Sequence, residues 1–114
     1  MTTDDKRESQ RWARRERAYI QLLFDDGGAV RVQTEDISAG GFRAALAAPL
    51  PEGSILHVVI ELSSSQSRYL LAAEVRWCRE LTAGHYHVGF SLLDARGTDY
   101  EAWQQFAGNP DGLL

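Results

Sequence analysis

Residues 35–43 read E-D-I-S-A-G-G-F-R, a stretch that places a carboxylate and a hydroxyl two positions apart. On a strand, Asp36 and Ser38 emerge from the same face, while the intervening Ile37 points the other way into the core. Such a pair suits a ligand with several N–H donors, and guanine fits because its Watson–Crick edge offers an N–H and an NH₂ to one carboxylate. The stretch therefore predicts half of a guanine-binding site, although these residue types are also typical of a tight turn.

Two glycines follow this pair and leave the backbone bare. Gly40 and Gly41 permit backbone conformations closed to other residues, and they let a ligand or another segment of the chain come close. We expect them to make room for the ligand beside Asp36 and Ser38.

The basic residues are concentrated near the start of the chain. Residues 6–17 contain six basic side chains against two acidic ones, whereas residues 18–114 contain six arginines against twelve acidic residues, within a net charge of −4. Guanidinium groups pair with phosphate through two parallel hydrogen bonds, grip the O6/N7 edge of guanine and stack on bases. A ligand that combines guanines with phosphates would engage this segment and the acidic stretch together. The candidate contacts are Arg11, Arg14, Arg15 and Arg17.

Short segments with strand-like patterns, separated by turn residues, make up most of the chain after residue 18. They predict six strands, over residues 19–24, 29–37, 41–46, 55–62, 69–81 and 85–93. Hairpin-like spacing favours antiparallel pairing, and closure of the sheet leaves no edge unpaired in so short a chain. The prediction is a six-stranded antiparallel β-barrel.

A change of period after the last strand predicts one helix. Tyr100, Trp103 and Phe106 recur at three-residue spacing between Thr98 as the N-cap and Gly108 as the stop, which indicates a helix at about 98–107. The fold class is therefore all-β with a C-terminal helix. We expect residues 1–17 to form a flexible arm and residues 18–114 to form the barrel with its helix.

The composition is that of a globular protein with one core. The chain has 114 residues, of which 44% are hydrophobic and 25% charged. No apolar run approaches the length of a membrane span and no signal-peptide core is present, so we expect a cytoplasmic protein with no membrane partner. Cys78 is the single cysteine, which agrees with a reducing compartment.

Catalytic and metal-binding patterns are missing from the sequence. It contains no Ser-His-Asp order, paired-carboxylate site or Walker-type phosphate loop, so we expect no enzyme. His85 and His87 share a strand face, but no third ligand lies nearby in the sequence, and we expect no metal site.

Together the motifs resemble the PilZ domain family, which pairs an R-x-x-x-R motif with a D/N-x-S-x-x-G motif on a six-stranded barrel. Asp36, Ser38 and Gly41 match the second motif in full. The likeness continues through P-L-P-E-G, E-V-R-W and H-V-G-F, at residues 49–53, 74–77 and 87–90. The resemblance implies a PilZ-like β-barrel that binds the bacterial second messenger cyclic di-GMP, often as an intercalated dimer.

The first motif can be placed in two registers, and both remain open. A literal R-x-x-x-R runs from Arg11 to Arg15. In the family the second arginine leads directly into the first strand, which favours Arg17 instead. Ala13 then occupies the place of the first arginine, and neighbouring Arg14 substitutes for it through its long side chain.

Two further positions acquire a binding role only through the resemblance. In some relatives an aromatic residue and an arginine after the E-V segment of the fifth strand touch the ligand, and here these are Trp77 and Arg79. By alternation alone, Trp77 shares the face of Ala73 and Val75, so core packing is favoured over ligand stacking. Arg79 by itself is expected to be a surface charge.

Three functions are therefore compared. The leading hypothesis is a cyclic di-GMP receptor or adaptor that changes its surface on binding and regulates an unidentified partner protein. The alternative is a degenerate PilZ-like adaptor that binds a protein partner without nucleotide, which the irregular arginine motif supports. A third hypothesis is a small barrel that binds single-stranded RNA through its basic arm. The acidic body counts against it, so we do not expect a nucleic-acid partner.

Overall fold

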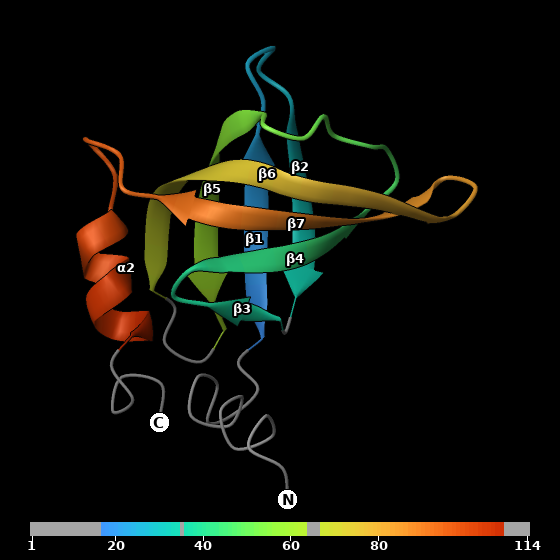
Figure 1. Ribbon diagram of the computed structural model, residues 1–114. Helices are drawn as coiled ribbons and strands as arrows, with labels where there is room; N and C mark the ends of the chain where they lie inside the picture. The colour runs from blue at the N-terminus through green and yellow to red at the C-terminus, as the bar shows by residue number, and fades with distance from the viewer. Residues whose placement is uncertain (1–16, 35, 64–66, 109–114) are drawn as a thin grey trace, which may run out of the picture.

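The computed structural model describes residues 17–34, 36–63 and 67–108 of the chain. In this part, seven strands form one antiparallel sheet in the order β2-β1-β5-β6-β7-β4-β3 (Figure 1). The strands are β1 (Ala18–Leu23), β2 (Ala29–Thr34), β3 (Ile37–Ser38), β4 (Gly41–Leu46), β5 (Ile55–Leu62), β6 (Arg68–Thr82) and β7 (His85–Leu93). Arg11, Arg14 and Arg15 lie outside the described residues, as does the expected arm apart from Arg17.

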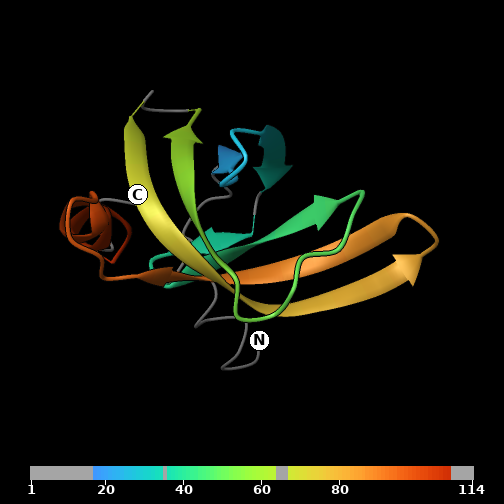
Figure 2. The ribbon, with the colours of Figure 1, turned by 90° about the horizontal axis from the view of Figure 1, so that it is seen from above.

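The sheet curls on itself into a nearly closed barrel. Seen from above, the strands surround a common interior, and the long hairpin of β6 and β7 extends beyond it on one side (Figure 2). β2 and β4 are not paired with each other in the sheet, yet they lie in contact. This contact brings the two ends of the curled sheet together. The predicted antiparallel barrel is thereby confirmed.

The structure has seven strands where the sequence predicts six, because the expected strand over residues 29–37 is divided. β2 ends at Thr34, whose hydroxyl accepts a hydrogen bond from the Asp36 N–H at 2.9 Å. This local bond turns the chain, and pairing resumes at Ile37 in the two-residue β3. The other predicted strands agree with the observed ones to within one residue at each end.

Alternate side chains of neighbouring strands point into the barrel and form its core. Leu22, Val58 and Leu71 are paired in register across β1, β5 and β6, and all three are fully buried. β4 and β7 continue the core with Phe42 and Phe90, whose rings stack with their centroids 4.6 Å apart. The remaining side chains of these strands therefore lie on the outer surface, where a ligand can reach them.

The helix α2 (Tyr100–Ala107) packs beside β6 (Figure 1). Trp103 is fully buried, and its ring meets that of Tyr69 edge-on at a centroid distance of 5.1 Å. The predicted helix is thus confirmed, with its aromatic stripe packed against the core. No helix in the described part of the chain has the length and apolar character needed to cross a membrane.

The ends of α2 differ in how well the sequence predicts them. The C-cap is Gly108, as predicted, but the N-cap is Asp99 rather than Thr98. The Asp99 carboxylate accepts the N–H of Leu70 at 2.8 Å and makes no bond to a helix N–H. Asp99 therefore attaches the start of the helix to β6 instead of capping it with its side chain.

Candidate functional site

The β3–β4 hairpin places the predicted acid and hydroxyl on the outside of the barrel. Ile37 pairs with Phe42 and both are buried, so they anchor the hairpin to the core. Asp36 is exposed and Ser38 is half-buried. Alternation along the strand therefore gives the correct faces, and the two polar side chains share the outer one.

Asp36 has an ion-pair partner that the sequence analysis did not identify. Arg43 Nη2 lies 2.7 Å from Asp36 Oδ2, and the Arg43 N–H donates to the Asp36 carbonyl at 3.1 Å. The side chains of Arg43 and Asp36 are 50% and 55% exposed, so the pair is open to a ligand. A signal for it was present, because a two-residue turn over Ala39 and Gly40 sets Asp36 opposite Arg43.

The two glycines of the motif have different structural roles. A Cβ on Gly41 would overlap the backbone carbonyl oxygen of Phe90, so the close approach of β7 requires glycine there. A Cβ on Gly40 would have no described atom within 4 Å. Of the two reasons expected for these glycines, the close approach of another segment accounts for Gly41. Open space that a ligand could fill is found at Gly40 and not at Gly41.

The hydroxyl of Ser38 is only weakly engaged within the hairpin. Its Oγ lies 3.5 Å from the Gly41 carbonyl oxygen, at the long limit of a hydrogen bond. The neighbouring turn is held more firmly, because the Leu92 N–H donates to the Gly40 carbonyl at 2.9 Å. Ser38 therefore keeps hydrogen-bonding capacity on a rigid support.

A β-bulge in β6 moves Trp77 to the outer face. Val75 pairs with Phe90, but Trp77 pairs with Gly89, so Arg76 has no partner in the ladder. The prediction that Trp77 packs in the core with Val75 is therefore wrong. Its half-buried indole lies over Gly89, where a Cβ would overlap the ring.

Cross-strand register joins Trp77 to the acidic motif. Gly89 pairs with Trp77 on one side and with Arg43 on the other, so these residues form one row across β6, β7 and β4. The guanidinium of Arg79 lies 5.5 Å from the centre of the Trp77 ring. One outer face thus carries a carboxylate, two guanidinium groups and an aromatic ring.

The chain matches one known protein family over most of its length. The family model described as the PilZ domain matches residues 5–107. The chain belongs to the PilZ domain family. A comparison with curated proteins gives no match.

Solved structures with the same fold include two proteins longer than this PilZ domain. The Bacillus subtilis inhibitor of motility, MotI/DgrA, is 22% identical with a TM-score of 0.60, over 82% of this chain and 49% of that chain. Escherichia coli YcgR in complex with c-di-GMP is 22% identical with a TM-score of 0.59, over 81% of this chain and 43% of that chain. The chain therefore spans less than half the length of either protein.

A third structure contains little besides the related domain. The PilZ domain of Escherichia coli YcgR with c-di-GMP is 21% identical with a TM-score of 0.55, over 86% of this chain and 91% of that chain. At this level of identity, the similarity establishes the fold and does not identify the binding residues.

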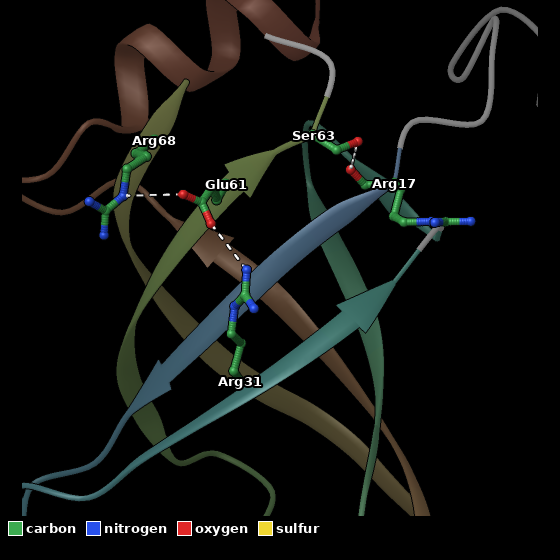
Figure 3. A network of polar contacts seen from close by, with 5 residues as sticks. All are labelled: Arg17, Arg31, Glu61, Ser63 and Arg68. Carbon is green, nitrogen blue, oxygen red and sulfur yellow. Dashed lines mark hydrogen bonds and ion pairs between the residues drawn. The ribbon is translucent and has the colours of Figure 1, made fainter. Parts of the chain in front are cut away.

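In this PilZ domain, the described end of the arginine segment lies near the acidic motif. Ala18 pairs with Thr34, so the chain that enters β1 runs alongside the chain that leaves β2 toward Asp36. The Arg17 carbonyl accepts hydrogen bonds from the Ser63 hydroxyl at 2.9 Å and the Ser63 N–H at 3.2 Å (Figure 3). Arg17 is thus held at the start of β1. This is the end of the β1–β2 ladder at which β2 ends and the acidic motif begins.

A separate polar network occupies the outer face of β2, β5 and the first part of β6. Glu61 lies 3.3 Å from Arg31 and 3.9 Å from Arg68 (Figure 3). Arg31 also lies over the ring of Tyr19, 4.3 Å from its centre. Arg31 and Arg68 pair with Glu61 and not with a residue of the acidic motif, so they are suitable controls for the arginines of the site.

The histidines and the cysteine do not gather into a metal site in the described residues. No group of three or more His, Cys, Asp or Glu side chains there could hold a metal ion. His87 pairs in register with Arg79 across β7 and β6.

Proposed function

We propose that this PilZ domain is a receptor for cyclic di-GMP that changes its surface on binding and thereby regulates a partner protein. The observation that carries the proposal is the row of Arg43, Gly89 and Trp77 on the outer face of the barrel, with Asp36 paired to Arg43 at one end. A carboxylate for a base edge and an aromatic face for a base plane are the two elements that guanine recognition needs.

The roles of the individual residues follow from their chemistry. Asp36 accepts hydrogen bonds from the Watson–Crick edge of a guanine, and Ser38 adds a hydroxyl on the same face. Trp77 offers its half-buried ring for stacking on a base, and the guanidinium of Arg79, 5.5 Å from the ring centre, can take part in the same stack. Two of the related structures, both of Escherichia coli YcgR, contain c-di-GMP, which supports the choice of this ligand.

The N-terminal arginines supply the phosphate contacts in this proposal. Arg17 is positioned next to the motif by the β1–β2 ladder, and Arg11, Arg14 and Arg15 precede it in the sequence. Each guanidinium can bind a phosphate through two parallel hydrogen bonds. An intercalated dimer of the ligand would present more phosphates and guanine edges than one molecule, and the basic excess of this segment suits that form.

The output of the receptor is proposed to pass through the motif turn to the helix. The Gln104 side chain of α2 donates a hydrogen bond to the Ala39 carbonyl at 2.6 Å. A ligand that contacts Asp36 and Ser38 therefore acts on a hairpin joined to α2, and the new surface includes the ligand, the arginines and this helix. The partner is a protein, and we place the receptor in the cytoplasm, in agreement with its single cysteine.

Calorimetric titration with cyclic di-GMP, beside GTP and GMP, tests the proposal. Asp36→Ala, or Arg14→Ala with Arg17→Ala, should weaken binding at least about 100-fold, because bonds to charged groups contribute roughly 1.5–3 kcal/mol each. Glu61→Ala and Arg68→Ala alter a charge pair elsewhere on the barrel and should leave affinity unchanged. No heat from the unmodified protein at about tens of micromolar ligand would reject the proposal.

A second function is favoured by the ion pair itself. Asp36 already has a cationic partner in Arg43 at 2.7 Å, so the motif is satisfied without ligand. A PilZ-like adaptor that binds protein without nucleotide would keep such a paired carboxylate. It predicts that no cyclic dinucleotide gives heat, and that Asp36→Ala leaves association with the partner protein unchanged.

A further inference from the structure

Arg43 lies beside Asp36, where its guanidinium can donate a hydrogen bond to a bound base as well as neutralise the carboxylate. We propose that Arg43 determines base specificity: its guanidinium donates to O6 of the guanine whose N1–H and N2–H₂ are bound by Asp36, and it thereby excludes adenine. This inference rests on the proposed function, because it concerns the same site.

The ion pair leaves donors available for a ligand. The terminal nitrogen Nη2 carries two hydrogens, and the contact with Asp36 Oδ2 at 2.7 Å uses one of them. Half of each side chain is exposed to solvent, so a base edge can approach the pair without displacing core residues. An exposed pair contributes little to stability, which means that its rearrangement around a ligand is easy.

The order of groups on the pair matches the order of groups on guanine. Along the Watson–Crick edge, the O6 acceptor lies next to the N1–H donor, which is followed by the N2 amine. A carboxylate that binds N1–H and the amine has one oxygen on the O6 side. A guanidinium attached to that oxygen reaches O6 with its remaining hydrogen, so Asp36 and Arg43 together complement all three groups.

Adenine presents the reverse pattern to the same pair. It carries an amine donor where guanine has O6, and an unprotonated N1 acceptor where guanine has N1–H. The donor would then face the guanidinium and the acceptor would face the carboxylate. Buried polar groups left unpaired by the wrong base are what gives a hydrogen-bonding site strong discrimination.

The backbone holds Arg43 in a fixed place relative to the rest of the row. Arg43 pairs with Gly89, which has no side chain, and Gly89 pairs with Trp77. Arg43 therefore projects from β4, which is the neighbour of β7, the strand whose Gly89 lies under the Trp77 indole. Its N–H also bonds to the Asp36 carbonyl at 3.1 Å, so both members of the pair are attached to one hairpin.

The test compares three cyclic dinucleotides in matched variants. Cyclic di-GMP, cyclic di-IMP and cyclic di-AMP are titrated calorimetrically into the unmodified protein, Arg43→Ala and Arg31→Ala. Inosine keeps O6 and N1–H but lacks the N2 amine, so it separates contacts to O6 from contacts to the amine. Arg31 is a suitable control, because it is an exposed arginine paired with a carboxylate at 3.3 Å on another part of the barrel.

We expect Arg43→Ala to lower the preference for cyclic di-GMP over cyclic di-AMP by about tenfold or more, the discrimination typical of one good base contact. Affinity for cyclic di-IMP should fall by the same factor as that for cyclic di-GMP, because both carry O6. Arg31→Ala should change neither quantity. Arg43→Met keeps the length of the side chain without a donor and gives the same test if Arg43→Ala does not fold.

Three results would overturn the inference. If Arg43→Ala keeps the preference to within about twofold, Arg43 does not read the base, and the receptor function stands. If it weakens cyclic di-GMP more than cyclic di-IMP, Arg43 acts only by orienting Asp36 toward the amine. If the unmodified protein binds no cyclic di-GMP, the proposed function fails and the inference fails with it.

Discussion

The indole ring of Trp77 lies over the backbone of Gly89, on the outer face of the barrel, because a bulge in β6 brings the two residues into register. Any Cβ on Gly89 would overlap ring atoms of Trp77. Gly89 is not among the glycines with positive φ, so glycine is required there for space and not for backbone conformation. The aromatic surface of the site therefore depends on a residue that contributes no side chain.

Replacement of Gly89 should disturb this surface without unfolding the barrel. In Gly89→Ala the indole of Trp77 must swing away, and because this ring is only half-buried, the loss of stability should be small. Cyclic di-GMP affinity should fall about tenfold or more, the typical contribution of one stacked base. Calorimetry measures the affinity, and acrylamide quenching measures tryptophan exposure without ligand. Unchanged quenching in the variant would contradict the placement of the ring over Gly89.

The adjacent glycines of the motif offer a matched pair of substitutions. Gly41→Ala places a methyl group against the Phe90 carbonyl and should separate β4 from β7, with a loss of roughly 1–3 kcal/mol in the free energy of unfolding. Gly40→Ala meets open space at a backbone without positive φ, and should be close to neutral or slightly stabilising. Chemical denaturation of both variants measures the difference. Equal losses would show that Gly41 is not held by β7.

Much of the fold could be predicted from local sequence patterns. β5 and β7 have the predicted bounds, because clear turn residues flank each strand. The outward direction of Asp36 and Ser38 followed from alternation about Ile37.

The errors come from strand pairing and from hydrogen bonds that the alternation within one strand does not reveal. The face of Trp77 depends on the unpaired Arg76, and a bulge is a relation between β6 and β7 that the sequence of one strand does not reveal. The division of the second predicted strand depends on one hydroxyl, that of Thr34. Arg43 could have been found by extending the hairpin pairing one step beyond Ile37 and Phe42. The binding roles of Arg11, Arg14 and Arg15 stay predictions, since these residues lie outside the described part of the chain.

Tyr86 gives the stability of the protein a defined dependence on alkaline pH. Desolvation, and then the negative charge of Glu80, raise the pKa of the Tyr86 phenol above its ordinary value. The folded protein therefore holds this proton more tightly than the unfolded chain does. Its stabilising contribution is complete below the unfolded pKa of about 10 and is lost as the pH rises through the folded pKa.

Two variants check this dependence on pH. Tyr86→Phe should lose less thermal stability than the unmodified protein as the pH is raised above about 10. Glu80→Gln should lower the pKa of Tyr86, measured by the ultraviolet absorbance of tyrosinate, because the carboxylate charge is gone. A titration of Tyr86 that is unaffected by Glu80→Gln would refute the assigned electrostatic cause.

The hydrogen bond between α2 and the motif turn can be tested independently of any ligand. Gln104→Ala removes the donor to the Ala39 carbonyl, which lies 2.6 Å from the side-chain nitrogen, and should cost about 1 kcal/mol of stability. Amide exchange in the turn should become faster, because the turn loses its attachment to the helix. Gln105→Ala, at an exposed position on the same helix, is the matched control and should leave both unchanged. If exchange in the turn is the same in both variants, the helix does not restrain the motif, and the proposed route from ligand to α2 is lost.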